Sequence, residues 1–482
     1  MDINKKQIVN GAFSVIVLLA GCHVPKVAAI KEIEPLPKQY VSNGSDTLNI
    51  AQLKFDDFFK DKNLLELINR TLKHNLDYKI ADEQIKIAEA YLLSRKGAML
   101  PSIVAGLRAS GTHYGKYTME GVGNFDTNLS SNIDNDQKIS TGITPDYWLG
   151  LNASWEADVW GKLGNMKRAG LARYLATTHG KHLLRTAIIT QTATLYYELV
   201  KLDNEIKILN RNIDLQKQAL EIVMVQKEVG RATELAVQQF QAQLMNTEAS
   251  LYDAKQQILS TENQLMALSG TYDGIIVRNE TIDIAGINYL QQHGNPLQLL
   301  QYRPDILAGY LELQATHADA KAARAAFFPI VNLSAYGAFN AFNGSVLFKP
   351  ASIAYQLLGS ITAPVFQQNQ LKANFKVVNA QQEISFLNYQ KLVINAYQEV
   401  KTLLRYIDNN QEILTLKRKE VSALSKSIDI SNDLYVTAYA SYLEIISAQK
   451  SKLAADLDLI KAQRNQAHIL IQLYKTLGGG WE

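Results

Sequence analysis

The sequence predicts a fold that combines long α-helices with membrane-spanning β-strands, and each chain is expected to be an internal duplication. Two long proline-free stretches carry apolar residues at every seventh position, which is typical of helices packed as coiled coils. Four segments of about ten residues alternate apolar and polar side chains, as membrane strands do. A shift of 208 residues places Leu235 on Leu443 and Gly270 on Gly478, so both halves repeat one plan.

The composition excludes several classes of protein. The 482 residues carry a net charge of +3 and no basic patch, so no nucleic-acid partner is expected. The hydrophobic content of 47% is ordinary for a folded protein. We find no nucleophile elbow and no phosphate-binding glycine loop, so the sequence predicts neither an enzyme nor a cofactor.

The first 21 residues have the layout of a secretory signal peptide. Lys5 and Lys6 form a basic start, residues 12–20 form an apolar run, and Gly21 is a small residue suited to a cleavage site. The run is too short to span a bilayer as a helix. We therefore predict a signal peptide over residues 1–21.

Cys22 is the only cysteine of the chain, so no disulfide can form within it. The Leu-Ala-Gly-Cys stretch that ends there resembles the bacterial lipoprotein box, which implies cleavage before Cys22 and acylation of its sulfur. The alternative is a buried cysteine in an uncleaved helix. The resemblance points to the outer membrane, because His23 stands where an aspartate would favour inner-membrane retention.

Residues 22–60 contain Pro25, Pro35 and Pro37 and few long apolar runs, which predicts an extended tether. After Cys22 no apolar run approaches the length of about 20 residues that a transmembrane helix needs. A mature chain that crosses a membrane must then do so as a closed β-barrel.

Two repeats fill most of the remaining chain, one over residues 61–270 and one over 301–478, with an equatorial connector over 271–300 and a tail over 479–482. Alternating polarity predicts four strands, at about 101–116, 145–158, 329–342 and 351–364. Between the first two strands, the stretch 117–146 is rich in Asn, Ser, Asp and Gly and is expected to be a solvated loop.

Each repeat is expected to end in a long helical hairpin. The helices are predicted at about 165–228, 231–270, 368–436 and 441–477. The first of them would be about 95 Å long at 1.5 Å per residue. The third carries the cleanest heptad series, which is Phe386, Val393, Val400, Ile407, Leu414, Val421, Ile428 and Tyr435.

Four strands are too few for a membrane barrel, since the smallest barrels have about eight. Open sheet edges cannot stand in lipid, because each unpaired backbone group there costs several kcal/mol. We therefore predict a homotrimer in which three copies with cyclic symmetry close a 12-stranded β-barrel, continued by an α-helical barrel. A soluble sandwich hairpin is the alternative explanation of the strands taken alone.

Several stretches resemble the TolC-like outer-membrane efflux proteins, and specifically their NodT-type lipoprotein branch. The signature is YRPDILAGYLELQATHADAKAARAAFFPIVNLSAYG at 302–337, and the family ending is LGGGW at 477–481. The stretches WEADVWGKLG at 155–164 and APVFQQNQL at 363–371 resemble the two strand-to-helix junctions of that family. One departure is FDDFF at 55–59, where the family usually has tryptophans.

This resemblance implies a trimeric outer-membrane exit duct that extends into the periplasm. Its partners would be a periplasmic adaptor protein, an inner-membrane pump of the resistance-nodulation-division type, and outer-membrane lipid. The pump supplies the energy, so the duct needs no catalytic residue. Three alternatives stay open: an exit duct for type I protein secretion, a duct for metal ions, and a periplasmic coiled-coil lipoprotein without a barrel.

The tips of the two helical hairpins are the candidate functional site. A carboxylate from each of three subunits would form an acidic ring that favours cations. The candidate gate residues are Glu444, Asp429, Asp433, Arg231 and Glu234, of which the last two could tie neighbouring hairpins together by ion pairs. The resemblance also gives candidate adaptor-docking residues, namely Gly230, Leu235, Ala438 and Leu443. Solvated helix faces and simple helix reversals are the alternatives.

Two further groups are explained more simply by structure than by function. Arg303, Pro304 and Asp305 are expected to open a helix, since proline fits the first turn and a carboxylate favours the positive helix end. His179 and His182 are spaced as two metal ligands on one helix face, but no third ligand lies nearby in the sequence. We therefore predict no metal site.

Overall fold

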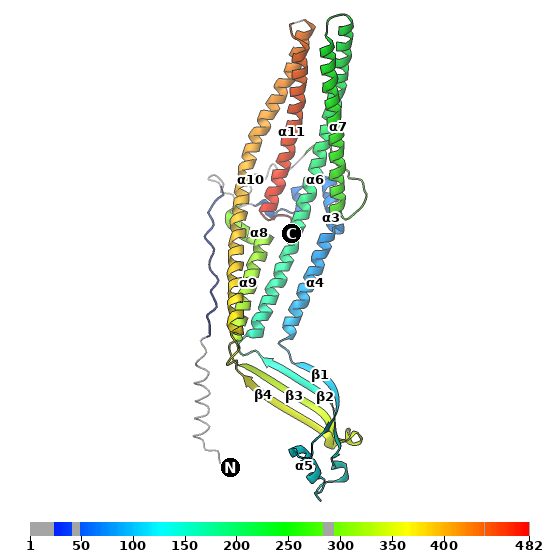
Figure 1. Ribbon diagram of the computed structural model, residues 1–482. Helices are drawn as coiled ribbons and strands as arrows, with labels where there is room; N and C mark the ends of the chain where they lie inside the picture. Colours follow the sequence, from blue (N-terminus) through cyan, green and yellow to red (C-terminus); the bar gives the residue numbers. More distant parts are fainter. Residues whose placement is uncertain (1–23, 41–48, 283–293, 438, 482) are drawn as a thin grey trace. The chain divides into compact units, whose positions relative to one another are not determined.

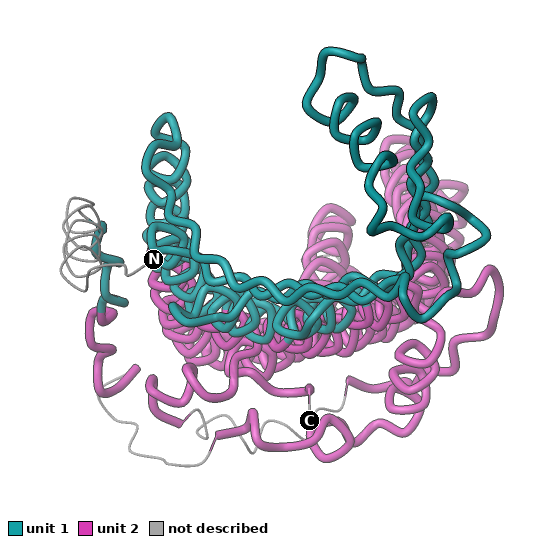
Figure 2. Tube along the Cα trace, turned by 90° about the horizontal axis from the view of Figure 1, so that it is seen from below, with its two compact units in different colours: residues 1–31, 87–174, 312–386 teal, residues 32–86, 175–311, 387–482 magenta. Residues whose placement is uncertain are grey.

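The computed structural model describes residues 24–40, 49–282, 294–437 and 439–481. The chain divides into two compact units, which are coloured separately in Figure 2. Unit 1 consists of Met1–Lys31, Ile87–Tyr174 and Glu312–Phe386, and unit 2 consists of Glu32–Lys86, Leu175–Leu311 and Leu387–Glu482. The predicted Cys22 acylation site and Ala438 lie outside the described residues.

Unit 1 contains one antiparallel sheet with the strand order β1-β2-β3-β4 (Figure 1). The strands are β1 (Ser102–His113), β2 (Ile143–Ala157), β3 (Ile330–Ala341) and β4 (Ile353–Thr362). Each strand pairs only with its neighbours in this order, so within the described residues the outer edges of β1 and β4 have no partner strand. The sheet is open at both sides.

The register of the sheet collects most of the large apolar residues of the four strands on one face. Leu107 lies opposite Leu149, which lies opposite Phe339, and Phe339 lies opposite Ile353. Side chains two residues apart share a face. The face is strongly exposed, as the 80% exposure of Leu357 illustrates. We call it the apolar face.

The opposite face carries the polar side chains, and we call it the polar face. Arg108 lies opposite Trp148, and Trp148 lies opposite Asn340. The side chain of Asn340 donates a hydrogen bond of 2.6 Å to Asp146, whose carboxylate is 3.7 Å from the Arg108 guanidinium. All three charged residues of the strands, which are Arg108, Asp146 and Glu156, belong to this face.

The loop between β1 and β2 contains more structure than the sequence predicts. Residues Met119–Thr127 form helix α5, and Asn135–Gln137 form a short 3₁₀ turn. The side chain of Thr118 caps α5 by accepting a hydrogen bond of 3.1 Å from the backbone N–H of Gly121. The prediction of a solvated loop was therefore incomplete, because a capped helix stands within it.

Two junctions in unit 1 turn the chain from a strand into a long helix. After β2, the Asp158 carboxylate accepts hydrogen bonds from the backbone N–H groups of Leu163 (2.8 Å) and Gly164 (2.6 Å), which caps α6 (Lys162–Glu228). After β4, Gln368 and Asn369 adopt positive φ angles of 47° and 62° directly before α10 (Gln370–Val436). Each junction motif thus contains residues that shape the start of the following helix, namely Asp158 in the first and Gln368 and Asn369 in the second.

Small side chains allow α6 to approach α9 (Pro304–Ala325) closely within unit 1. Ala169 and Ala172 of α6 form a buried cluster with Ala315 and Ala318 of α9. Beside this cluster the guanidinium of Arg173 reaches two carboxylates of α9, at 2.6 Å and 3.4 Å. A further helix, α4 (Leu76–Gly97), begins in unit 2 and ends in unit 1.

Unit 2 holds the main hydrophobic core. It contains α3 (Lys62–His74), α7 (Glu234–Leu268), α8 (Leu299–Tyr302) and α11 (Tyr442–Thr476), together with the larger parts of α6 and α10. The largest fully buried side chains of its core include Tyr196, Tyr197, Tyr474, Phe58 and Phe59. The heptad residues Val393, Val400 and Ile407 of α10 belong to the same core.

The prediction of an extended tether over residues 22–60 is wrong for its last third. Ile50–Gln52 form a 3₁₀ turn and Phe55–Phe58 form helix α2. The ring of Phe58 stacks on Tyr474 with 4.2 Å between centroids, and Phe59 is also buried. The FDDFF stretch therefore supplies aromatic core side chains to unit 2.

The connector over 271–300 forms no strand among its described residues, and Arg278 fixes it to unit 2. The guanidinium of Arg278 bonds the carboxylates of Asp203 (2.5 Å) and Glu262 (2.7 Å), and these partners raise the pKa of Arg278. The backbone N–H of Asn279 donates to the hydroxyl of Tyr196 at 3.1 Å. Across all the residues that the structure describes, none of the helices is both long and apolar enough to span a membrane.

Candidate functional site

The first helix tip lies between α6 and α7, in unit 2. Gly230 has a φ of +73°, a conformation that favours glycine. The backbone N–H groups of Arg231 and Ala232 both donate to the carbonyl of Gln226, at 2.8 and 3.2 Å. The hydroxyl of Thr233 then caps α7 by accepting from the N–H of Ala236 at 3.2 Å. The tip is thus a short reversal held by backbone hydrogen bonds and a helix cap.

Glu234 is bonded within its own hairpin. Its carboxylate accepts hydrogen bonds from Lys227 across the turn and from Gln238, the latter at 2.8 Å. These two bonds and the charge of Lys227 lower the pKa of Glu234. Arg231 is exposed and forms no ion pair with any described residue. Within one chain, therefore, Arg231 and Glu234 do not tie the two hairpins together. Lys227, the partner of Glu234, was not among the predicted site residues.

The second tip, between α10 and α11, repeats the backbone hydrogen bonds of the first. The backbone N–H groups of Tyr439 and Ala440 both donate to the carbonyl of Leu434, at 2.8 and 3.1 Å. The hydroxyl of Ser441 caps α11 by accepting from the N–H of Leu443 at 3.3 Å. The backbone donors, their acceptor and the capping hydroxyl are offset by 208 residues from those of the first tip, the same shift that relates the two repeats. The capped N–H differs, because Leu443 is the counterpart of Leu235 and not of Ala236.

Glu444 forms a capping box with Ser441. Its carboxylate accepts hydrogen bonds from the Ser441 hydroxyl and from the Ser441 backbone N–H, the latter at 2.9 Å. The hydrogen bond from the Ser441 side chain is the main cause of the lowered pKa of Glu444. Glu444 therefore stabilises the start of α11, in addition to any effect of its charge on the pore. Asp429 and Asp433 are exposed on α10 and form no ion pair among the described residues.

Side chains of both hairpins meet near the two tips, inside unit 2. We call their buried contact the tip cluster, and its buried members are Val223, Ala236, Val237, Phe240 and Ile445. The hydroxyl of Tyr435 on α10 donates a hydrogen bond to the side-chain carbonyl of Gln226 on α6. By contrast, Leu235 and Leu443 are 60% and 51% exposed, so both are accessible to a partner.

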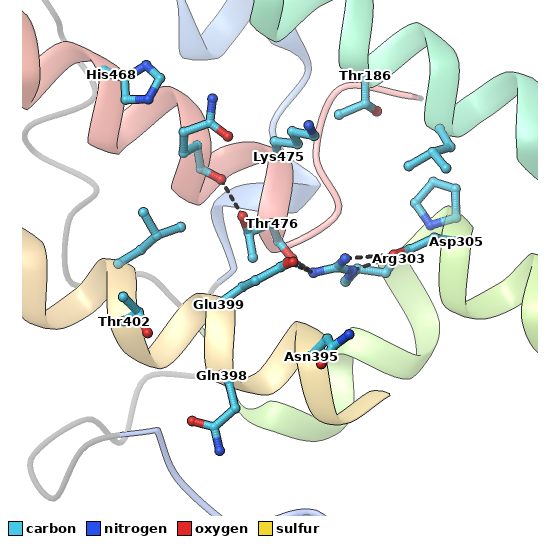
Figure 3. Close-up of a pocket in the computed structure, with 14 residues that line it drawn as sticks. Thr186, Arg303, Asp305, Asn395, Gln398, Glu399, Thr402, His468, Lys475 and Thr476 are labelled. Atoms are coloured by element: carbon cyan, nitrogen blue, oxygen red, sulfur yellow. Dashed lines mark hydrogen bonds and ion pairs between the residues drawn. The ribbon is translucent and has the colours of Figure 1, made fainter. Parts of the chain in front are cut away.

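A polar pocket of about 820 Å³ lies between α6, α9, α10 and α11 in unit 2 (Figure 3). Arg303 is its most connected residue. Its guanidinium forms two hydrogen bonds with Asp305, at 3.0 and 2.6 Å, and one with Glu399 at 2.9 Å. Burial alone would lower the pKa of Arg303, but the bonds to both carboxylates raise it above its usual value. The Arg-Pro-Asp motif thus ties the start of α9 to α10.

His179 and His182 pack against the tail at 479–482 within unit 2. The ring of His182 stacks on Trp481 with 4.8 Å between centroids, and His179 meets both rings edge-on. The indole N–H of Trp481 donates to the carbonyl of Tyr302 at 2.9 Å. The described residues contain no group of three or more His, Cys, Asp or Glu side chains arranged to hold a metal ion. The histidine pair is thus accounted for by packing.

A model of the outer membrane efflux protein family matches residues 67–271 and 295–479. These two segments cover most of the chain and correspond to its two halves. The chain belongs to this family. An outer membrane efflux protein is located in the outer membrane, so the open sheet of unit 1 and the long hairpins of unit 2 are parts of an efflux protein of that membrane.

Relatives from several bacteria extend over the whole chain. The cation efflux system protein CusC of Escherichia coli is 25% identical over 476 residues, which is 98% of each chain. The probable outer membrane lipoprotein SilC of Salmonella typhimurium is 25% identical over 477 residues, again 98% of each chain. The solvent efflux pump outer membrane protein SrpC of Pseudomonas putida is 25% identical and covers 97% of each chain.

Solved structures have the same fold. A crystal structure of CusC matches with a TM-score of 0.80 and 23% identity, covering 95% of this chain and all of that one. The open state of the MtrE outer membrane channel of Neisseria gonorrhoeae matches with a TM-score of 0.79 and 21% identity, over 95% of this chain and 98% of that one. The architecture of both units therefore recurs in known outer membrane channels.

Proposed function

We propose that this protein is the outer-membrane exit duct of a tripartite efflux pump and conducts small toxic compounds passively to the exterior. The match of the efflux family to both halves of the chain is the observation that carries the proposal. The duct acts as a conduit, and the proposal requires no catalytic residue. A periplasmic adaptor protein and an inner-membrane pump of the resistance-nodulation-division type supply the coupling and the energy.

The sheet of unit 1 supports a homotrimer. Its edge strands β1 and β4 run in opposite directions and lack partners within one chain, so β4 of one copy can pair antiparallel with β1 of the next. Three copies then close a 12-stranded barrel, with the apolar face toward lipid and the polar face toward the pore. The helices of unit 2 continue the duct into the periplasm.

The oligomeric state tests this assembly directly. Purified in detergent, the protein is expected to migrate as a trimer that converts to monomer only on heating. A monomeric particle that remains folded and inserted in membranes would refute the barrel. The same experiment distinguishes the duct from a coiled-coil lipoprotein without a barrel.

Acylation of Cys22 is part of the proposal. Two or more acyl chains anchor a protein firmly, since each buried methylene contributes about 0.8 kcal/mol. Replacing Cys22 by Ser is expected to abolish incorporation of labelled palmitate. Labelling that persists in this variant would locate the anchor elsewhere.

The helix tips are proposed to gate the duct and to dock the adaptor. Exposed carboxylates at Glu444, Asp429 and Asp433 would form acidic rings in a trimer and favour cations. Leu235 and Leu443 are exposed, and each is the second residue of the helix that follows a reversal, which suits an adaptor contact in both hairpins. Single-channel recordings of Glu444→Gln are expected to show altered cation selectivity or altered block by divalent cations, and unchanged recordings would remove Glu444 from the gate.

The names of the relatives point to two classes of cargo, cations and organic solvents. The relatives CusC and SrpC belong, by name, to a cation efflux system and a solvent efflux pump, so a metal-ion duct is the second candidate. Seven methionines without clustering give it no support from soft-ligand chemistry. Deleting the gene and measuring susceptibility to antibiotics, dyes, solvents and silver or copper salts separates these classes. Unchanged susceptibility with loss of a secreted protein would favour type I secretion instead.

A further inference from the structure

Helix α5 presents three large apolar side chains to solvent. Met119, Val122 and Phe125 are 89%, 57% and 60% exposed. Their spacing of three residues places them along one side of the helix. Asp126 borders this side, and Glu120 lies away from it. A capped helix with an exposed apolar side needs an apolar partner, because such surface is unfavourable in water.

The contacts of α5 fix the direction of this apolar side. The Asn124 side chain donates a hydrogen bond of 3.3 Å to the hydroxyl of Thr144 at the start of β2. At about 100° per residue, Asn124 lies about 200° around the helix from Val122. The apolar side therefore points away from the strand that holds the helix. Asn128 and Ile139 close the loop by two further hydrogen bonds of 2.7 and 2.8 Å.

Thr144 belongs to the polar face of the sheet. It lies opposite Thr112 and is in line with Trp148 and Asn152, which share that face. The other distal loop reaches the apolar face instead, where Phe348 contacts Phe339 with 5.8 Å between ring centroids. The two loops thus join opposite faces of the sheet, and α5 belongs to the face that lines the pore in the proposed trimer. Figure 1 shows α5 beyond the ends of β1 and β2.

We propose that the apolar sides of α5 from three copies meet at the distal mouth of the pore and form an apolar constriction. This inference rests on the proposed trimeric duct. Lipid is excluded from the pore, so the surfaces available to cover this side of α5 are the two equivalent helices related by the three-fold axis. A narrow apolar ring hinders water and polar solutes by dewetting. The constriction would limit inward leakage of polar compounds through an outwardly exposed duct.

Cysteine cross-linking tests the contact. Val122→Cys places one thiol on the apolar side, and Glu120→Cys is the matched control on the same helix; the only other cysteine is Cys22. In intact cells a short bismaleimide is expected to produce cross-linked dimers with Val122→Cys and none with Glu120→Cys. If Val122→Cys assembles poorly, Phe125→Cys replaces it. Polar replacement in Phe125→Asn is expected to increase the entry of a large glycopeptide antibiotic.

Three other outcomes would contradict the constriction or the trimer. In one outcome the trimer stays intact, but Val122→Cys and Phe125→Cys are not cross-linked and react fully with a water-soluble maleimide. This result would refute the constriction and leave the proposed duct unaffected. In another outcome a nitroxide in the lipid phase quenches a fluorophore attached to these thiols. This result would refute the constriction and show that α5 contacts the membrane instead. Loss of the wild-type trimer itself would refute the proposed duct, so the two failures are distinguishable.

Discussion

The turn between α6 and α7 and the turn between α10 and α11 have the same backbone hydrogen bonds, but different side chains stabilise them. In both, two consecutive N–H groups converge on one carbonyl, that of Gln226 or that of Leu434. The packing is unequal, however. Four of the five buried residues in the tip cluster come from α6 and α7, and only Ile445 comes from α11. Duplication thus preserved the turn, while the side chains around it diverged.

The unequal packing predicts the largest effect. Phe240 is 1% exposed, and the residue 208 positions later is Ala448. Phe240→Ala gives the first hairpin the side chain that the second hairpin has at this position. Because it removes a buried ring, it is expected to lower the free energy of unfolding by about 3–5 kcal/mol. Hydrogen exchange measured by mass spectrometry is expected to show faster exchange in peptides that span residues 219–240.

Leu235→Ala is the control for this experiment, since Leu235 is exposed and its loss creates no cavity. Its exchange is expected to match that of the wild type. If Phe240→Ala also left exchange unchanged, the tip cluster would contribute nothing to the stability of the first tip.

A smaller effect is expected from the backbone of the first turn. Gly230 has a φ of +73° and nothing lies within 4 Å of a Cβ built there, so Gly230→Ala introduces backbone strain but no clash. The expected cost is about 1–2 kcal/mol. Gly180→Ala is the matched control, because Gly180 also has open space but lies within α6, where alanine stabilises a helix by about 1 kcal/mol. Gly230→Ala should speed exchange of the tip and lower the thermal stability, whereas Gly180→Ala, near the other end of α6, should raise the thermal stability and leave tip exchange unchanged. Equal effects of the two variants would show that Gly230 carries no conformational constraint.

Variants of the capping box in the second tip distinguish the structural role of Glu444 from the role of its negative charge. Ser441→Ala removes the cap of α11 and is expected to destabilise the tip by about 1 kcal/mol. Glu444→Gln keeps a side chain that can complete the box, so exchange of the second tip should stay near that of the wild type, whereas Glu444→Ala should open it. If Glu444→Gln opens the tip as much as Glu444→Ala, the negative charge is what the cap requires, and the conductance of Glu444→Gln could not be interpreted as gating alone.

The sequence predicted the long elements well, because their periodicity extends over many residues. The stretch expected at 165–228 is α6 at Lys162–Glu228, and that expected at 145–158 is β2 at Ile143–Ala157. A heptad or an alternation repeated many times outweighs single unfavourable residues. The apolar face that the four strands share could not be predicted without the register of the strands. This register places Leu107, Leu149 and Phe339 opposite one another and is set by contacts between residues distant in sequence.

Features that depend on a few residues were missed or incomplete. Phe58 and Phe59 enter the core through contacts with Tyr474, more than 400 positions away, which no local pattern reveals. Helix α5 is short and surrounded by turn-forming residues, so its pattern was hidden. At the site, Glu444 was singled out for its charge, although Ser441 three residues earlier is a capping-box signal that the sequence itself contains.

The smallest expected effect concerns the Lys227–Glu234 ion pair, which has no counterpart among the described residues of the second tip. Lys227 holds the pKa of Glu234 below its ordinary value, so the pair stabilises the tip above the pKa of an unfolded glutamate and is lost as the pH falls through the lowered folded value. Both side chains are exposed, and added salt should weaken the pair. Corrected for intrinsic rates, exchange of the first tip in Glu234→Gln should exceed that of the wild type at neutral pH and low salt, and the two should converge at acidic pH or high salt. A difference that persisted under both conditions would show that the ion pair with Lys227 is not what stabilises the tip.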